Sequence, residues 1–474
     1  MTAETARFYD EMLEQGGRPR PLYRRVHRTL ERIGRTDLRR RQAQAERAFR
    51  DHGITFTVYS DDRGTEKLFP FDLIPRVLEH ATWARIEAGL KQRVTALNHF
   101  LEDVYGAQRI LRQGAVPADV VLSSAGFARE LVGLAAPHGI HCHVAGIDLV
   151  RDGRGDFLVL EDNLRTPSGV SYVLANRQVL KRVLPEIFVG HDVLPVDGYG
   201  HELLAVLRWL APPGVEDPTV VLLTPGIFNS AYFEHLYLAK QMGVQLVEGS
   251  DLLVDRDRVF MRTTAGLRPV HVIYRRVDDE FMDPLAGRGD SLIGVPGLVG
   301  AYRAGGVALA NGLGNGVADD KAVYALVPDM IRYYLGEEPL LGSVPTFLCA
   351  RPDERRHVIA HLEEMVVKAV AQSGGYGMLI GPMSTAAQRE RMRRRVEARP
   401  RDYIAQPVID LSVQPALLAA GRASRHQDLR PFVLTGPEVA VLPGGLTRVA
   451  LRPGSLVVNS SQGGGSRDTW VLAG

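Results

Sequence analysis

The segment at residues 148–169 constrains the fold of this chain most strongly, because it combines apolar runs, a tight turn and a cluster of polar side chains. It reads D-L-V-R-D-G-R-G-D-F-L-V-L-E-D-N-L-R-T-P-S-G. Residues 144–150 are apolar and β-prone, residues 152–155 (D-G-R-G) are a strong turn signal, and residues 157–160 are apolar again. Two apolar runs joined by such a turn are typical of a β-hairpin.

Three oxygen-bearing side chains fall at the open end of the predicted hairpin. Glu161 and Asn163 share a face, because side chains along a strand alternate with a period of two, and Asp148 lies on the first strand at the same end. Two carboxylates and an amide carbonyl are hard oxygen ligands of the kind that Mg²⁺ prefers, with water and substrate phosphates completing its shell. We therefore expect metal-assisted phosphoryl chemistry at these residues. A polar strand end that leads into a turn is the alternative interpretation.

A turn and a predicted helix follow directly. Residues 166–169 (T-P-S-G) precede an apolar pattern of helical period at residues 173–180, which makes Thr166 or Ser168 the expected N-cap. Free N–H groups and the helix dipole attract anions. The sequence thus predicts that Ser168 and Gly169 bind a substrate carboxylate or phosphate beside the metal ligands.

The composition is that of an ordinary globular chain, and it narrows the choice of partners. With 474 residues, 45% of them hydrophobic and 24% charged, the chain is long enough for roughly two to four domains. The net charge of +2 gives no bulk electrostatic reason to expect nucleic acid or a membrane surface as a partner. Cys142 and Cys349 have no metal or redox spacing, and neither a signal-peptide core nor a membrane-length apolar stretch occurs. We expect a cytoplasmic protein without a disulfide framework.

A strand–helix–strand order and a pair of arginines mark the middle of the chain. Residues 220–223, 231–242 and 243–247 predict a βαβ unit in a parallel layer, although its loop lacks the G-x-G-x-x-G of dinucleotide-binding sites. Arg275 and Arg276 follow an apolar strand at residues 270–273. Binding of an anionic substrate and surface salt bridging are the two interpretations of this pair.

Two lysines and a glycine-rich loop indicate phosphate binding. Lys321 follows a glycine-rich passage at residues 310–316, and Lys368 ends an apolar strand shortly before S-G-G-Y-G at residues 373–377. This is not the Walker loop, in which Gly-Lys-Ser/Thr opens a helix. Glycines let backbone N–H groups approach phosphate oxygens and a lysine supplies a point charge, so a flap over phosphates is the functional interpretation and a plain turn is the alternative.

In combination, these motifs resemble the circularly permuted ATP-grasp family, type 2, whose bacterial members are often described as glutathionylspermidine synthase-like. The set at residues 148, 161 and 163, with the Ser-Gly turn after it, is similar to the metal-binding end of ATP-grasp carboxylate–amine ligases, where that segment comes last. Here it precedes Lys321, the V-V-K that ends at Lys368, and Y-I-A-Q-P-V at residues 403–408. The resemblance extends from about residue 56 to the C-terminus.

The resemblance implies an α/β fold of the circularly permuted ATP-grasp type, with a Rossmann-like parallel-sheet domain and a helical N-terminal arm. The expected parts are residues 1–52 (helical arm), 53–205 (catalytic half with the metal-binding hairpin), 206–310 (Rossmann-like pre-ATP-grasp domain) and 311–474 (nucleotide-binding half).

It also implies ATP and Mg²⁺ as cofactors, with Asp148, Glu161 and Asn163 holding the metal. Lys321 and Lys368 would reach the α- and β-phosphates. The mobile loop over them would consist of Ser373, Gly374, Gly375, Tyr376 and Gly377. The hinge strand that contacts adenine would include Val408 and Gln406, which stands where many ATP-grasp enzymes have Glu. The candidates for stabilising the transferring phosphoryl group are Arg165, Arg430 and Arg448.

The expected activity is that of an ATP-dependent carboxylate–amine ligase that forms an acyl phosphate and releases ADP and phosphate. Its substrates would be small-molecule or peptide carboxylates and amines, with no nucleic acid or membrane partner. A small-molecule kinase on the same fold and a non-catalytic ATP-binding partner protein are the alternatives. A hydrolase that uses Cys142 or Cys349 is disfavoured, because neither cysteine lies in a recognisable nucleophile motif.

Overall fold

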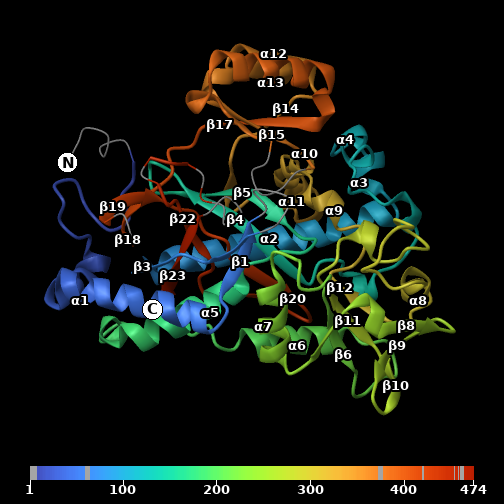
Figure 1. Ribbon diagram of the computed structural model, residues 1–474. Helices are drawn as coiled ribbons and strands as arrows, with labels where there is room; N and C mark the ends of the chain where they lie inside the picture. Colours follow the sequence, from blue (N-terminus) through green and yellow to red (C-terminus); the bar gives the residue numbers. More distant parts are fainter. Residues whose placement is uncertain are drawn as a thin grey trace.

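The computed structural model describes residues 8–58, 65–371, 377–418, 421–452, 454–456, 458 and 464–474, and Figure 1 shows their arrangement. These residues form a mixed α/β structure with several sheets, one of which is parallel. The predicted α/β fold class is confirmed. Among the described residues, no helix combines the length and the hydropathy that a membrane span requires.

The predicted hairpin is present and lies at the centre of a five-stranded sheet. β4 (Val144–Arg151) and β5 (Phe157–Asn163) pair antiparallel, with Asp148 opposite Glu161. The other strands of this sheet come from much later in the chain: β13 (Gly342–Ser343), β20 (Phe432–Thr435) and β21 (Val439–Val441). The sheet therefore joins the hairpin to the C-terminal part of the chain.

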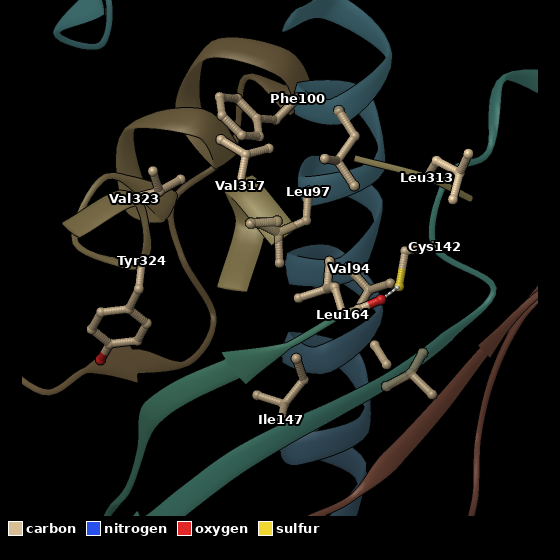
Figure 2. Close-up of a cluster of buried hydrophobic side chains, with 14 of the residues drawn as sticks. Val94, Leu97, Phe100, Cys142, Ile147, Leu164, Leu313, Val317, Val323 and Tyr324 are labelled. Atoms are coloured by element: carbon tan, nitrogen blue, oxygen red, sulfur yellow. Dashed lines mark hydrogen bonds between the residues drawn. The ribbon is translucent and has the colours of Figure 1, made fainter. Parts of the chain in front are cut away.

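One long helix packs behind this hairpin. α2 (His80–Tyr105) is this helix, and its buried positions follow the helical period. Figure 2 shows Val94, Leu97 and Phe100 of this helix in one buried cluster with side chains of the hairpin and of residues 313–324. Each fully buried side chain of this size stabilises the fold by about 1.5–3 kcal/mol. The cluster therefore fixes the hairpin and the segment that carries Lys321 against the same helix.

The predicted βαβ unit is also present. The four strands in the order β12-β11-β6-β7 are all parallel. The helix α7 (Tyr232–Met242) lies between β6 and β7 in the chain and connects them. All residues of β6 are buried, as expected of a strand covered on both faces. The strand bounds are β6 (Val220–Leu223), β7 (Gln245–Val247), β11 (Val272–Arg275) and β12 (Ala308–Ala310).

A smaller unit carries the second lysine. Its antiparallel sheet has the order β14-β17-β15-β16 and packs with two helices around its own apolar core, which includes Val358, Val367 and Ala405. Figure 1 shows this unit in orange at the top of the molecule. Its elements are β14 (Phe347–Leu348), α12 (Pro352–Ala360), β15 (Met365–Ala369), β16 (Leu379–Ile380), α13 (Ala386–Ala398) and β17 (Tyr403–Pro407).

A fourth sheet joins early and late parts of the chain. β3 (Phe71–Leu78) lies parallel to β23 (Gly465–Val471), which also pairs with β22 (Thr447–Val449). α5 (Val170–Val183) and α1 (Arg24–Asp51) contribute to the same apolar core as β3. The division of the chain into four domains at the boundaries given above stays a prediction.

A buried carboxylate near the N-terminus links several of these elements. Glu11 is 2% exposed; its carboxylate pairs with Arg76 of β3 at 2.5 Å and with Arg151 of β4 at 3.3 Å, and it accepts a hydrogen bond from Ser412. Burial opposes ionisation, but the two guanidinium groups outweigh it and lower the pKa of Glu11 to about 2. The ionised form therefore stabilises the fold.

Glu11 makes the stability of the fold depend on acid pH. Its pKa is about 2 in the folded chain and 4.5 in an unperturbed glutamate, so its contribution is present above pH 4.5 and is lost as the pH falls toward 2. We expect the stability difference between wild type and Glu11→Gln to shrink by about 3 kcal/mol over this interval. Urea denaturation at several pH values measures it, with Glu14→Gln as the control. A difference that stays constant with pH would contradict the assignment.

Candidate active site

A cleft of about 450 Å³ brings together residues that are far apart in the sequence. The end of β5 contributes Glu161 and Asn163, and Arg165 follows two residues later. A second segment contributes Asp319, at the end of α9 (Gly316–Asp319), and Lys321, at the start of α10 (Lys321–Tyr324). Val370 and Ala371, which follow the Lys368 strand, also line the cleft. The cleft therefore lies between the hairpin and the part of the chain predicted to bind nucleotide.

Two of the three predicted metal ligands line this cleft. The amide nitrogen of Asn163 donates to the Gly146 carbonyl at 3.2 Å, which leaves its Oδ1 as the atom suited to a cation. The Glu161 carboxylate lies 3.4 Å from the Lys321 ammonium group. One carboxylate and one amide oxygen from the protein fit Mg²⁺, which takes its remaining ligands from phosphates and water.

Asp148 has a different environment from the other two. It is 4% exposed, and its carboxylate is bound by Arg430 at 2.5 Å and by Arg448 at 2.7 Å. Burial alone would raise the pKa of Asp148, but the two guanidinium groups hold it well below the ordinary value. Both carboxylate oxygens are thus engaged by arginines, while Asp148 also interacts electrostatically with Lys368, so metal binding by Asp148 stays a prediction.

Arg430 and Arg448 are themselves held in place by buried carboxylates. Arg448 also pairs with the buried Asp428 at 2.5 Å, and Arg430 donates to the Ser168 carbonyl at 3.2 Å. The two arginines and the two aspartates form a charge-balanced network in which Arg448, Asp148 and Asp428 are buried and Arg430 is partly exposed. Arg430 and Arg448 both bind Asp148 in this structure, and contact of either arginine with the transferring phosphoryl group stays a prediction.

Arg165 is the predicted phosphoryl-binding arginine that does line the cleft. Its side chain is 37% exposed and lies 3.4 Å from Asp278 and 3.6 Å from Asp319. Burial raises the pKa of Asp319 to about 6 in spite of the nearby arginine. Asp319 was not among the predicted site residues. The signal that could have identified it is its place in A-D-D-K, directly before Lys321.

The two predicted phosphate-binding lysines lie near the hairpin ligands. Lys321 contacts Glu161, and its backbone N–H donates to the Val370 carbonyl at 3.4 Å. The ammonium group of Lys368 donates to Gln406 Oε1 at 2.8 Å. Burial lowers the pKa of Lys368 to about 8; Glu161 and Asp148 oppose this shift and Lys321 adds to it. The electrostatic interaction with Glu161 and Lys321 places Lys368 in their neighbourhood.

The predicted hinge strand is β17, next to the Lys368 strand. The side chain of Gln406 is 3% exposed and bridges Lys368 and the Thr346 hydroxyl, to which its amide nitrogen donates at 2.9 Å. The Val408 N–H donates to the Glu364 carbonyl at 3.2 Å. Gln406 thus orients Lys368 in this structure; adenine contacts of Gln406 and Val408 stay a prediction.

The predicted phosphate flap falls mostly outside the described part of the chain. Ser373, Gly374, Gly375 and Tyr376 are not among the described residues. Gly377 is described; it is exposed and has a φ of +70°, in the left-handed region that favours glycine. Val370 and Ala371, the last described residues before this segment, line the cleft.

The start of α5 differs from the prediction in its capping. Gly169, not Thr166 or Ser168, is the N-cap, and no side chain of the cap residue closes the helix. The Glu234 carboxylate of α7 instead accepts hydrogen bonds from the backbone N–H groups of Gly169 (2.7 Å) and Ser171 (3.1 Å). An internal carboxylate therefore takes the place predicted for a substrate anion.

Both predicted anion-binding arginines are also bound within the protein. Arg276 donates to Ser168 Oγ at 2.7 Å and lies 3.2 Å from Glu234. Arg275 donates to the carbonyls of Asn311 and Gly312, each at 2.7 Å, and pairs with Asp279 at 2.6 Å. Both side chains are buried. These internal contacts engage Arg275, Arg276, Ser168 and Gly169 within the protein, and substrate binding by these residues stays a prediction.

Neither cysteine is suited to nucleophilic catalysis. Cys142 and Cys349 are both 0% exposed. Burial raises the pKa of Cys142 well above its ordinary value and that of Cys349 to about 12, so the reactive thiolate is scarce in both. The disfavoured hydrolase interpretation gains no support from this geometry.

Known proteins share the sequence and the fold over nearly the whole chain. The sequence model of the family described as circularly permuted ATP-grasp type 2 matches residues 75–450. An uncharacterized protein of Synechocystis sp. is 54% identical over 468 residues, which cover 98% of this chain and 97% of that protein. A Frankia casuarinae protein named as a candidate glutamate–cysteine ligase 2-2 is 45% identical, and the match covers 98% of this chain but 53% of that protein.

A solved structure supports the fold independently. The apo structure of a glutathione synthetase-like effector from Globodera pallida aligns with a TM-score of 0.59, over 91% of this chain and 96% of that chain. The sequence identity is 11%, so this likeness concerns the fold.

Proposed function

Because the chain belongs to the circularly permuted ATP-grasp type 2 family, we propose that it is an ATP-dependent ligase that joins a carboxylate to an amine. The observation that carries the proposal is the pairing of Glu161 with Lys321 in one cleft, close to Lys368. Oxygen ligands for a divalent cation and cations for phosphates thus lie at the same place. A site of this composition catalyses by positioning and electrostatics, without an enzyme nucleophile.

In the proposed reaction, Lys321 and Lys368 bind the phosphates of ATP, and Glu161 and Asn163 hold Mg²⁺. The metal, when bound, offsets negative charge on the phosphates. A substrate carboxylate oxygen attacks the γ-phosphorus, the bond to the ADP oxygen breaks, and an acyl phosphate forms. The amine then attacks the acyl carbon, loses a proton and displaces phosphate. Arg165 is the cleft residue placed to offset charge on the transferring group.

The identity of the acid and the amine is open to direct test. The Frankia relative is named for glutamate and cysteine, but this chain corresponds to about half of that protein (53%). Glutamate and cysteine are therefore tested as one of several acid–amine pairs. Purified protein is incubated with Mg²⁺ and ATP against amino acids, peptides and polyamines, singly and in pairs. ADP release and new masses are followed together.

The ligase proposal predicts that ADP appears only when an acid and an amine are both present, together with the mass of their amide. Glu161→Gln should abolish this reaction, whereas Glu87→Gln, which alters a surface Glu–Lys pair at 2.6 Å on α2, should leave it unchanged. ADP with a single substrate and a phosphorylated product would identify a kinase instead. ATP binding without ADP from any pair would favour the non-catalytic alternative.

The proposed role of Lys368 predicts that ATP affinity depends on pH. Its pKa is about 8, so the ammonium form that binds phosphate is lost above this pH. We expect the Kd for Mg²⁺–ATP to rise about tenfold between pH 7 and pH 9. Calorimetric titration measures this change. Lys368→Met should bind more weakly at both pH values and lose most of the dependence; an equal dependence in the variant would assign the titration to another group.

A further inference from the structure

Three polar side chains at four-residue spacing lie directly before Lys321. Asn311, Asn315 and Asp319 fall in the segment between β12 and α10. All three bind the backbone of Leu164 or Arg165, the residues that directly follow Asn163. We call this set the 311–319 clamp.

The clamp satisfies backbone groups that have no strand partner. Asp319 Oδ1 accepts from the N–H groups of Leu164 (2.6 Å) and Arg165 (3.2 Å). The amide nitrogen of Asn311 donates to the Leu164 carbonyl at 2.5 Å and to the Arg165 carbonyl at 3.2 Å, and that of Asn315 donates to the Leu164 carbonyl at 3.3 Å. Buried peptide groups need such partners, and side chains of the clamp, together with the Cys142 thiol, supply them for Leu164.

Asn311 also holds the other strand of the hairpin. Its Oδ1 accepts from the N–H groups of His143 and Val144, each at 2.8 Å, and its amide nitrogen donates to the Val144 carbonyl at 2.7 Å. One buried amide, 1% exposed, therefore ties the start of β4 to the end of β5.

Lys321 is fixed by the same segment. Asp320 caps α10 by accepting from the Ala322 N–H at 2.8 Å, and it pairs with Arg401 at 2.9 Å. Beneath the clamp, Leu313 and Val317 pack in the cluster that contains Leu164, as Figure 2 shows. The same segment therefore holds both the clamp and Lys321 against the end of the hairpin.

We propose that Asn311, Asn315 and Asp319 are positioning residues that set the distance between the oxygen atoms of Glu161 and Asn163 and the ammonium group of Lys321. This inference rests on the proposed function. Groups that orient metal ligands from outside the coordination shell change metal affinity or activity by about 10–100-fold when they are removed. The clamp should therefore act on the binding of metal together with nucleotide, beyond its effect on stability.

The test measures how much Mg²⁺ strengthens ATP binding. The Kd for ATP is determined by calorimetry in excess EDTA and in excess Mg²⁺, and the ratio of the two values is the metal-dependent gain. Asp319→Ala removes the acceptor for two successive N–H groups. Asp103→Ala is the matched control, because Asp103 accepts from the successive N–H groups of Arg109 and Ile110, both at 2.8 Å, and does not line the cleft. Melting temperatures of both variants are recorded.

We expect Asp319→Ala to lower the metal-dependent gain about tenfold and Asp103→Ala to leave it unchanged, even if both lower the melting temperature. Asp319→Asn retains an oxygen that can accept both hydrogen bonds, so it should recover most of the gain. Equal gains in the two alanine variants would overturn the positioning role. No recovery in Asp319→Asn would overturn it as well, because Asp319 would then act through its charge. If the wild-type chain binds no ATP, the proposed function itself fails, and the inference fails with it.

Discussion

Lys321→Met is expected to reduce ATP turnover by about a hundredfold or more, the cost of removing one preorganised group that stabilises charge in a transition state. Lys321 is the lysine that lines the cleft and contacts Glu161, and methionine retains most of the length of the side chain without the charge. The loss should appear in kcat as well as in the Kd for ATP, because charge on the phosphates shifts during transfer. The measurement is ADP release with the acid–amine pair that the wild type accepts.

Lys91→Met is the matched control for this variant. Lys91 forms a surface pair with Glu87 on α2 and is 42% exposed, so its removal takes away a Glu–Lys contact of the same kind at a distance from the cleft. Its turnover should equal that of the wild type. If Lys321→Met retained turnover within about threefold of wild type, Lys321 would not contact the reacting phosphates.

Glu234→Ala should destabilise the fold by about 3–5 kcal/mol, because it leaves the buried Arg276 without its carboxylate partner. The change also removes the acceptor for two N–H groups at the start of α5 and for the Ser171 hydroxyl. Glu234 is 0% exposed, so water does not replace these contacts. Urea denaturation, followed by circular dichroism, measures the loss.

Two further variants test whether the loss of stability in Glu234→Ala comes from the Glu234–Arg276 pair. Glu202→Ala, at an exposed position of α6 (Tyr199–Trp209), should have little effect. The double variant Glu234→Ala/Arg276→Met removes both charges and should be more stable than the sum of the two single changes predicts. A loss below about 1 kcal/mol in Glu234→Ala would show that Glu234 is not the partner that closes α5.

Local patterns predicted the hairpin, and long-range contacts decided which of its side chains face the cleft. The D-G-R-G turn and the period of two placed Glu161 and Asn163 correctly at one strand end, and the apolar run before Lys368 predicted its strand. Asp148 fits the same pattern, but its partners Arg430 and Arg448 come almost 300 residues later. No periodicity in the sequence encodes such a pairing.

At the start of α5, too, a local signal predicted the helix but not the group that binds its N-terminus. The T-P-S-G turn correctly predicted that a helix begins there, because that signal is local. The group that binds its N–H donors comes from α7, and tertiary packing alone brings Glu234 to that point. Asp319 was likewise missed, since its role depends on the peptide groups of Leu164 and Arg165 rather than on its neighbours in sequence.

The order in which the strands emerge from the ribosome sets when this protein can complete its fold. β4 is synthesised long before its neighbour β20, with Ala145 opposite Val433, and β3 before β23, with Phe71 opposite Ser466. Such pairings have high contact order, and folding slows as contact order rises. Until Arg430 and Arg448 leave the exit tunnel, the nascent hairpin carries an Asp148 charge that opposes its own burial. Burial of the hairpin with the Asp148 charge paired therefore becomes possible only after both arginines have been synthesised.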